Sequence, residues 1–156
     1  MNDQKYTIGV ISDTHGKMDP KVSDVFQGVD HIIHAGDVCG LDIIPKLSKI
    51  APVTAVKGNM DSGDLSMRLK ATETIKFGRA LVYVLHISHM LDIEPDKDGF
   101  NVIITGHTHV PRIEIKNKVL YLNPGSATLP RHQNPPSVAL LSIDGQDINA
   151  EIIKLK

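Results

Sequence analysis

Four short motifs bring together side chains that could bind metal ions. They are Asp13-Thr14-His15, Gly36-Asp37, Gly58-Asn59 and Gly106-His107-Thr108-His109. Aspartate, asparagine and histidine offer mixed oxygen and nitrogen donors, and such donor sets suit a borderline transition metal. In the first and last motifs one residue separates the two donors, and in extended backbone residues two apart point the same way. Each of these pairs is therefore predicted to present both donors to one place.

Each of the four motifs follows a short apolar run that is typical of a β-strand, either directly or after one residue. These runs cover residues 6–12, 31–35, 53–56 and 102–105. Ligands of open α/β sheets bind at the carboxyl ends of the strands, so the four strand ends can converge on one site. Gly-Asp and Gly-Asn taken alone are ordinary turn dipeptides. The order of the motifs and their shared place at strand ends therefore indicate a metal site, which no single motif would.

The elements that position these motifs differ between the two halves of the chain. Apolar residues recur at helical spacing over 22–29 and 42–50, between the first three strands. This β-α-β-α-β order predicts a parallel sheet with crossover helices. The second half predicts a short helix near 89–95 and otherwise further strands, over 73–76, 80–86, 112–115, 119–122, 137–143 and 148–155. We expect one α/β domain over residues 1–156, with two sheets packed face to face and helices outside.

The composition excludes several classes of protein. The chain has 156 residues, a formal net charge of −1 and a single cysteine, so neither a disulfide framework nor a polybasic tail is expected. No stretch reaches the roughly 18–20 apolar residues of a membrane helix, and no signal segment is recognisable, so we expect a cytoplasmic protein. Aromatic residues make up only 4%, whereas there are eight histidines. Metals rather than stacking groups are therefore expected to hold a substrate, and nucleic acid is not favoured as a partner.

The order of the motifs resembles that of the calcineurin-like metallophosphoesterases. The pattern is Asp-x-His, Gly-Asp, Gly-Asn, a later His and Gly-His-x-His, and the match spans residues 8–126. The short length, Ser12-Asp13-Thr14-His15-Gly16 and Asn123-Pro124-Gly125-Ser126 resemble the small prokaryotic phosphodiesterase branch of that family. The resemblance implies a four-layer αββα sandwich of two mixed β-sheets flanked by helices, with a two-metal centre.

The resemblance also implies a role for seven residues. The first metal would be bound by Asp13, His15 and His109. The second metal would be bound by Asn59, His86 and His107, and Asp37 would bridge the two. Among these ligands, the ones expected to act in catalysis are Asp37, Asn59 and His107.

Two departures from the family pattern concern the second metal and the leaving group. The family usually has His-Gly-His after the strand, whereas this chain has His86-Ile87-Ser88-His89, so His89 is an alternative ligand to His86. Larger members have a histidine after Gly-Asn that can protonate the leaving group, and here that position is Met60. Asp61 next to it either tethers a metal-binding histidine or caps the following turn.

The resemblance implies a metal-dependent phosphoesterase, in particular a phosphodiesterase that attacks small phosphate esters with a hydroxide activated between two divalent ions. Manganese is the expected metal, and iron, cobalt, nickel or zinc are alternatives because the donor set suits all of them. A homodimer is expected from the family. The alternative function is a non-catalytic protein-interaction scaffold with the same fold, as in the retromer subunit that shares it. Such a scaffold has no need of a complete donor set.

Overall fold

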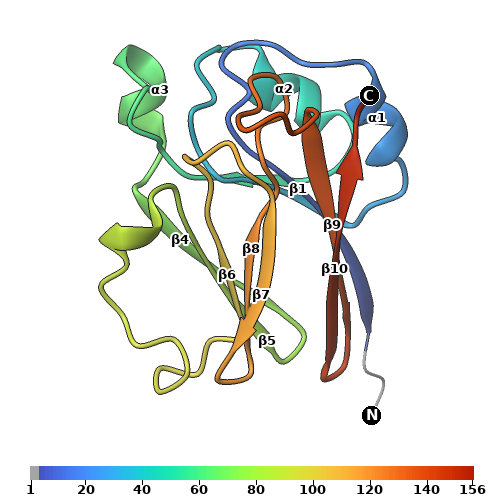
Figure 1. Cartoon of the computed structure of the whole chain (residues 1–156), viewed down its shortest axis with the longest axis vertical. Coiled ribbons are helices and arrows are strands. Elements are labelled where there is room, and N and C mark those ends of the chain that lie inside the picture. Colours follow the sequence, from blue (N-terminus) through green and yellow to red (C-terminus); the bar gives the residue numbers. More distant parts are fainter. Residues whose placement is uncertain (1–3) are drawn as a thin grey trace.

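The computed structural model describes residues 4–156 and contains two five-stranded mixed sheets (Figure 1). The strand order of the first sheet is β10 (Asp147–Lys154), β9 (Ser137–Asp144), β1 (Lys5–Ile11), β2 (His31–His34) and β3 (Val53–Ala55). The strand order of the second is β4 (Thr72–Phe77), β5 (Ala80–Leu85), β6 (Val102–Ile104), β8 (Val119–Asn123) and β7 (Arg112–Lys116). All ten strands expected from the sequence are thus present, and their bounds differ from the expected ones by no more than one residue.

The main hydrophobic core lies between the two sheets. Val10 and Ile33 from the first sheet and Val84 and Ile104 from the second are fully buried in one cluster. Alternate residues of each strand point to opposite faces, so the aliphatic strands fill this core and a second layer at once. Aliphatic side chains therefore fill the interior although the chain has few aromatic residues.

Helices cover the outer face of the first sheet. The short helices α1 (Lys21–Val25) and α2 (Ile43–Ser48) pack Val22 and Leu47 against this face, where Ile32 is also buried. A third helix, α3 (Gly63–Arg68), follows β3 and adds Leu65 to the same cluster. The sequence analysis expected the first two helices, though longer, and did not predict α3.

The outer face of the second sheet is covered mainly by an irregular segment. Leu91, Ile93 and Phe100 pack there against Tyr83 and its neighbours. The helix expected near 89–95 is reduced to the 3-10 turn η1 (Ser88–Met90). Proline at position 95 and the Asp-Lys-Asp-Gly run after it disfavour a longer helix. The αββα order expected from the sequence is confirmed, and its fourth layer is a loop with one helical turn.

The topology brings the motif-bearing loops together at one end of the sandwich. Strands β1, β2 and β3 run parallel, as do β5, β6 and β8. Backbone hydrogen bonds join the loops that follow them, from Asp13 N to Gly36 O (3.0 Å) and from Gly106 N to His86 O (3.0 Å). Both sheets therefore deliver their strand ends to one site.

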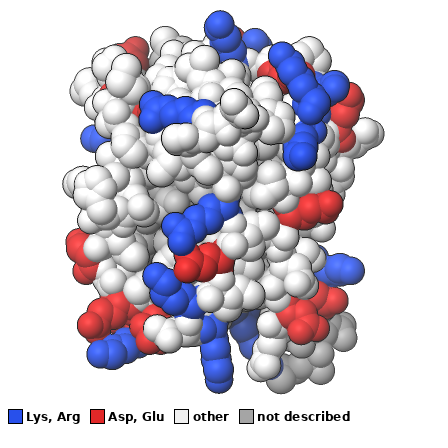
Figure 2. Space-filling model, in the orientation of Figure 1, with Lys and Arg blue, Asp and Glu red and all other residues white. Residues whose placement is uncertain are grey.

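Figure 2 shows basic and acidic side chains interspersed over one face of the molecule, with no broad patch of a single sign.

Within residues 4–156, no helix is long and apolar enough to cross a membrane.

Candidate metal centre

Left-handed backbone positions the candidate ligands. Six non-glycine residues in three loops have φ between 48° and 72°, namely Asp13, His15, Asp37, Cys39, His107 and His109. L-residues rarely adopt this conformation, and it persists where the surrounding structure enforces it, often at functional sites. The sequence analysis expected each i, i+2 pair to converge because the backbone is extended, and that reason is wrong. The pairs converge because left-handed residues alternate along tight loops.

Asp13 lies at the middle of the site and is fully buried. Its Oδ2 accepts hydrogen bonds from Ser12 Oγ (2.6 Å) and from the His107 amide (3.0 Å). Its Oδ1 accepts none, although it lies 3.3 Å from His109 Nε2. Burial raises the pKa of this carboxyl group, although the Ser12 hydrogen bond opposes the shift. A buried carboxylate oxygen without a donor is rare in folded proteins, and a cation at this point would satisfy it.

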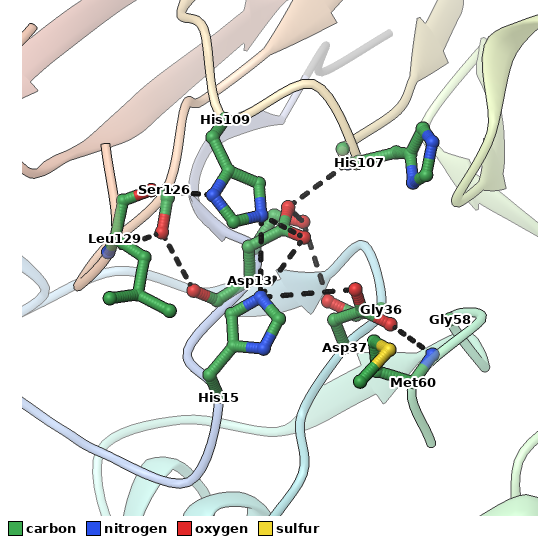
Figure 3. A network of polar contacts seen from close by, with 12 residues as sticks. Asp13, His15, Gly36, Asp37, Gly58, Met60, His107, His109, Ser126 and Leu129 are labelled. Carbon is green, nitrogen blue, oxygen red and sulfur yellow. Dashed lines mark hydrogen bonds and ion pairs between the residues drawn. The ribbon is translucent and has the colours of Figure 1, made fainter. Parts of the chain in front are cut away.

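His15 and His109 point at the same oxygen of Asp13 (Figure 3). The two Nε2 atoms are 3.3 Å apart, and His15 Nε2 lies 3.7 Å from Asp13 Oδ1. His109 is held from behind, because its Nδ1 contacts the carbonyl oxygen of Leu129. That contact places the proton on Nδ1 and leaves the Nε2 lone pair free to bind a metal.

Asp37 and His86 form the second cluster around Asp13. Asp37 Oδ2 lies 3.2 Å from His86 Nε2 and 3.8 Å from His15 Nε2. Its position between rings of the two clusters suits a bridging carboxylate. Desolvation acts against the charged form of Asp37, but the neighbouring His86 ring and the hydrogen bond from the Met60 amide outweigh it and lower its pKa.

The structure shows which of the two alternative histidines, His86 or His89, faces the site. Its Nδ1 donates to the Ala35 carbonyl oxygen (2.7 Å), while its buried Nε2 has no hydrogen-bond partner and faces both carboxylates. Burial favours the neutral ring, but the nearby Asp37 and Asp13 carboxylates prevail and raise its pKa. His89 is instead exposed on η1. Of the two histidines, only His86 faces the site.

Asn59 and His107 lie at the rim of the site and bond to each other. His107 Nδ1 lies 3.1 Å from Asn59 Oδ1, and its ring is 5.3 Å from that of His86. Figure 3 shows the His107 ring pointing away from Asp13, unlike the rings of His15 and His109. Burial and the neighbouring His86 lower the pKa of His107, which favours the neutral form that a metal ligand requires.

Asp61 organises the loops around Asp37 through their backbone. Its carboxylate accepts hydrogen bonds from the amides of Asp37 (3.0 Å), Gly58 (2.9 Å) and Cys39 (2.8 Å). Its bond to Gly58 closes the local turn, and no bond to a histidine is present among those of the described residues. These bonds match neither role left open for Asp61: its carboxylate holds the preceding turn from Gly58 and the loop of Asp37 and Cys39.

Glycines in the motifs allow two kinds of close packing. Gly36 has φ of 102°, as expected for a tight turn before a ligand. At Gly58, a Cβ atom would lie 2.2 Å from Asp37 Oδ1, and at Gly106 it would lie 2.0 Å from Ser12 Oγ. Side chains at these two positions would displace the carboxylates or the residues that hold them.

The sequence analysis missed several residues that support the site. Ser126 Oγ donates to the Asp13 carbonyl oxygen (2.8 Å) and Ser12 Oγ donates to the Asp13 carboxylate, although the sequence analysis assigned neither serine a role. Thr14 links the buried His34 ring (3.0 Å) to the Val38 carbonyl oxygen (3.0 Å). Their place within or beside the motifs was the only signal for these roles.

Comparisons with known proteins agree with this geometry. A family model, the calcineurin-like phosphoesterase superfamily domain, matches residues 6–146. A probable metallophosphoesterase of Methanothermobacter thermautotrophicus is 40% identical over 158 residues, covering 94% of this chain and 91% of that protein. The phosphodiesterase YfcE of Escherichia coli is 28% identical over 158 residues, covering 85% of each chain.

A solved structure shares the whole fold. A variant of Vps29 from Entamoeba histolytica matches with a TM-score of 0.75 and 25% sequence identity, covering 96% of this chain and 99% of that one. The resemblance inferred from the motifs is thereby confirmed, and so is the expected class of metallophosphoesterase. The chain belongs to the calcineurin-like phosphoesterase superfamily.

Proposed function

We propose that this chain is a metal-dependent phosphodiesterase that hydrolyses small phosphate esters at a two-metal centre. The observation that carries this proposal is the buried Asp13 Oδ1, which has no hydrogen-bond donor although imidazole nitrogens face it. The buried His86 Nε2 likewise has no hydrogen-bond partner. Two orphaned polar atoms aimed at one point fit bound cations, which would satisfy both.

We assign the ligands as the family pattern implies. Asp13, His15 and His109 would hold one ion, Asn59, His86 and His107 the other, and Asp37 would lie between them. The two clusters that share Asp13 support this division. Divalent ions held there would supply hydroxide near neutral pH and offset charge on the phosphoryl oxygens.

The chain's own groups then favour esters whose leaving groups depart easily. Met60 occupies the position at which larger members of the family have a histidine that protonates the leaving group, and its thioether cannot donate a proton. His89 is exposed on η1 and does not face the site. Without a proton donor, the departing oxygen depends on its own basicity. A phosphodiester with an acidic alcohol or phenol is therefore favoured over an alkyl monoester.

Nitrogen and oxygen donors define the metal preference. The single thiol of the chain belongs to Cys39, and burial together with the negative charges of Asp61 and Asp37 raises its pKa to about 12 in the metal-free protein. Cys39 belongs to neither ligand cluster, and its Sγ lies 3.8 Å from His15 Nδ1, on the other side of the ring from the Nε2 atom that faces Asp13, so the proposed centre has no sulfur ligand. We propose manganese as the native ion, with iron, cobalt, nickel and zinc as the alternatives that such a donor set accepts.

A scaffold function like that expected for a retromer subunit is the alternative. The likeness to Vps29 supports the fold in either case. A scaffold has no need of buried carboxylates aimed at imidazoles, because uncompensated buried polar groups cost stability. The clusters around Asp13 therefore favour the enzyme.

Metal analysis and hydrolysis of bis(4-nitrophenyl) phosphate, with and without Mn²⁺, test the proposal. We expect two ions per chain and hydrolysis that depends on them. Asp37→Asn is expected to lower the rate by about 10²–10³-fold because it removes one charge between the ions. Asp92→Asn, at an exposed position, is the matched control and leaves the rate unchanged. Absence of bound metal, or full activity of Asp37→Asn, would overturn the two-metal proposal.

A further inference from the structure

Large apolar side chains are exposed directly beside the candidate metal centre. Leu41 and Met60 are each 59% exposed, although folding favours the burial of such residues. Together with Cys39 and Leu65 they line a pocket of about 270 Å³, with Asp64 at the same wall. An exposed apolar patch that forms a concave surface is typical of a binding site.

Contacts on the pocket wall connect it to the candidate ligands. Cys39 Sγ lies 3.8 Å from His15 Nδ1 and 3.8 Å from the Met60 carbonyl oxygen. The Met60 amide donates to Asp37 Oδ1 (2.8 Å). Figure 3 shows this bond between the Met60 amide and the Asp37 carboxylate. The pocket thus borders the loops that carry His15 and Asp37, within reach of an ester group of a substrate bound at the metal centre.

The lining of the pocket limits what can occupy it. Leu41, Met60 and Leu65 form the apolar part of its wall, beside the polar groups of Cys39, Ser62 and Asp64, and no lysine or arginine is among its lining residues in the described part of the chain. Asp64 is the single charged group, and it would repel an anion. The volume lies just below the range of about 300–1,000 Å³ for pockets that hold drug-sized ligands, so a single ring fits better than a nucleotide.

We propose that this pocket binds one ester group of the substrate and selects a neutral, apolar, ring-sized group over a small or an anionic one. The inference rests on the proposed phosphodiesterase function and names the substrate class for it. Met60 and Leu41 provide the apolar contact, and Asp64 provides the discrimination against negative charge.

Binding of phosphonates to the metal-loaded protein tests the pocket without any catalytic step. Phenylphosphonate, methylphosphonate and 4-carboxyphenylphosphonate share the group that meets the metals and differ only in what enters the pocket. We expect calorimetry to give phenylphosphonate about tenfold higher affinity than methylphosphonate, since a ring buries more apolar surface. The added carboxylate is expected to abolish that advantage, and Asp64→Asn to restore it.

Two methionines on neighbouring segments give a matched pair of variants. Met60→Gln is expected to lower the preference for the phenyl group several-fold, while Met67→Gln leaves it unchanged, because Met67 is 87% exposed on α3 and does not line the pocket. In protein labelled at the methionine methyl groups, phenylphosphonate should shift the NMR signal of Met60 and not that of Met67.

The outcomes separate this inference from the function on which it rests. Equal affinity for the phenyl and methyl ligands, together with no effect of Met60→Gln, would overturn the pocket assignment while phosphodiester hydrolysis persists. A protein partner, rather than the substrate, would then be the expected ligand of the exposed Leu41 and Met60. If the metal-loaded protein binds no phosphonate and hydrolyses no phosphodiester, the proposed function itself fails.

Discussion

The two halves of the candidate metal centre differ in how completely they are assembled. Asp13, His15 and His109, the whole ligand set of the first ion, have donor atoms within 4.8 Å of one another, whereas among the ligands of the second ion only His86 and the bridging Asp37 form such a cluster with Asp13. Asn59 and His107 instead bond to each other, and the His107 ring points away from Asp13 (Figure 3). The first half is prearranged for an ion, whereas the second half must exchange an internal hydrogen bond for metal contacts.

Burial explains much of this difference. Asp13 and His109 are 0% and 6% exposed, and hydrogen bonds to serine and backbone groups fix both of them. Asn59 is exposed on the loop after β3, so water can replace its contacts at little cost. A prearranged site loses less conformational freedom on binding and therefore binds more tightly. We infer that the ion at Asp13, His15 and His109 binds first.

Removing the residue common to both clusters should have the largest effect. Asp13→Asn takes away the charge at the middle of the site and is expected to lower kcat/KM by about 10³-fold or more. Metal analysis should show that both ions are lost, and thermal unfolding of the metal-free variant should exclude a folding defect. Retention of two ions by Asp13→Asn would contradict the shared role of this carboxylate.

The strands and the position of the site could be predicted from the sequence. Short β-branched and aliphatic runs that end in Gly or Asp mark strands and their ends, so loops such as those after β1 and β6 could be placed on one edge. Helix α3 was not predicted because only one residue of it, Leu65, is buried, which leaves no apolar periodicity.

The left-handed backbone of the ligand loops could not be derived from local sequence. Asp13 and His107 adopt positive φ because hydrogen bonds from distant segments enforce it, such as the bond from the His107 amide to Asp13 Oδ2. The orientation of His86 likewise depends on the Ala35 carbonyl oxygen, 51 residues away in the chain. Sequence spacing places these residues near the site, and only tertiary contacts decide where their side chains point.

Separate variants in the two halves should sharpen the comparison. His109→Ala is expected to lower the affinity for the first ion by at least the roughly 100-fold seen for losses of outer partners of a ligand. His107→Ala should leave one ion bound with nearly unchanged affinity, because the buried half stays intact. Calorimetric titration with Mn²⁺ gives both stoichiometry and affinity. Equal losses in the two variants would show that the halves bind as one unit.

A smaller effect, on stability, is expected from His34. Its ring contacts Thr14, between Asp13 and His15, and the Gly36 amide, next to Asp37. The ring is fully buried, its Nδ1 accepts the Gly36 amide (3.1 Å), and burial lowers its pKa to about 4. In the unfolded chain the pKa is about 6.5, so between these values the unfolded state binds more protons than the folded state. The stability that depends on a neutral His34 is complete above pH 6.5 and is lost as the pH falls towards 4.

The size of this loss follows from the shift, and a variant isolates it. A difference of about 2.5 pH units corresponds to about 3 kcal/mol of unfolding free energy. Urea unfolding of metal-free protein should therefore show a steeper decline between pH 6.5 and 4 for the wild type than for His34→Gln. His132→Gln, at an exposed position, serves as the control and should follow the wild type. Parallel pH profiles for the wild type and His34→Gln would mean that this buried ring accepts a proton without loosening the loops that hold Asp13 and Asp37, and the contrast in rigidity between the two halves would need another source.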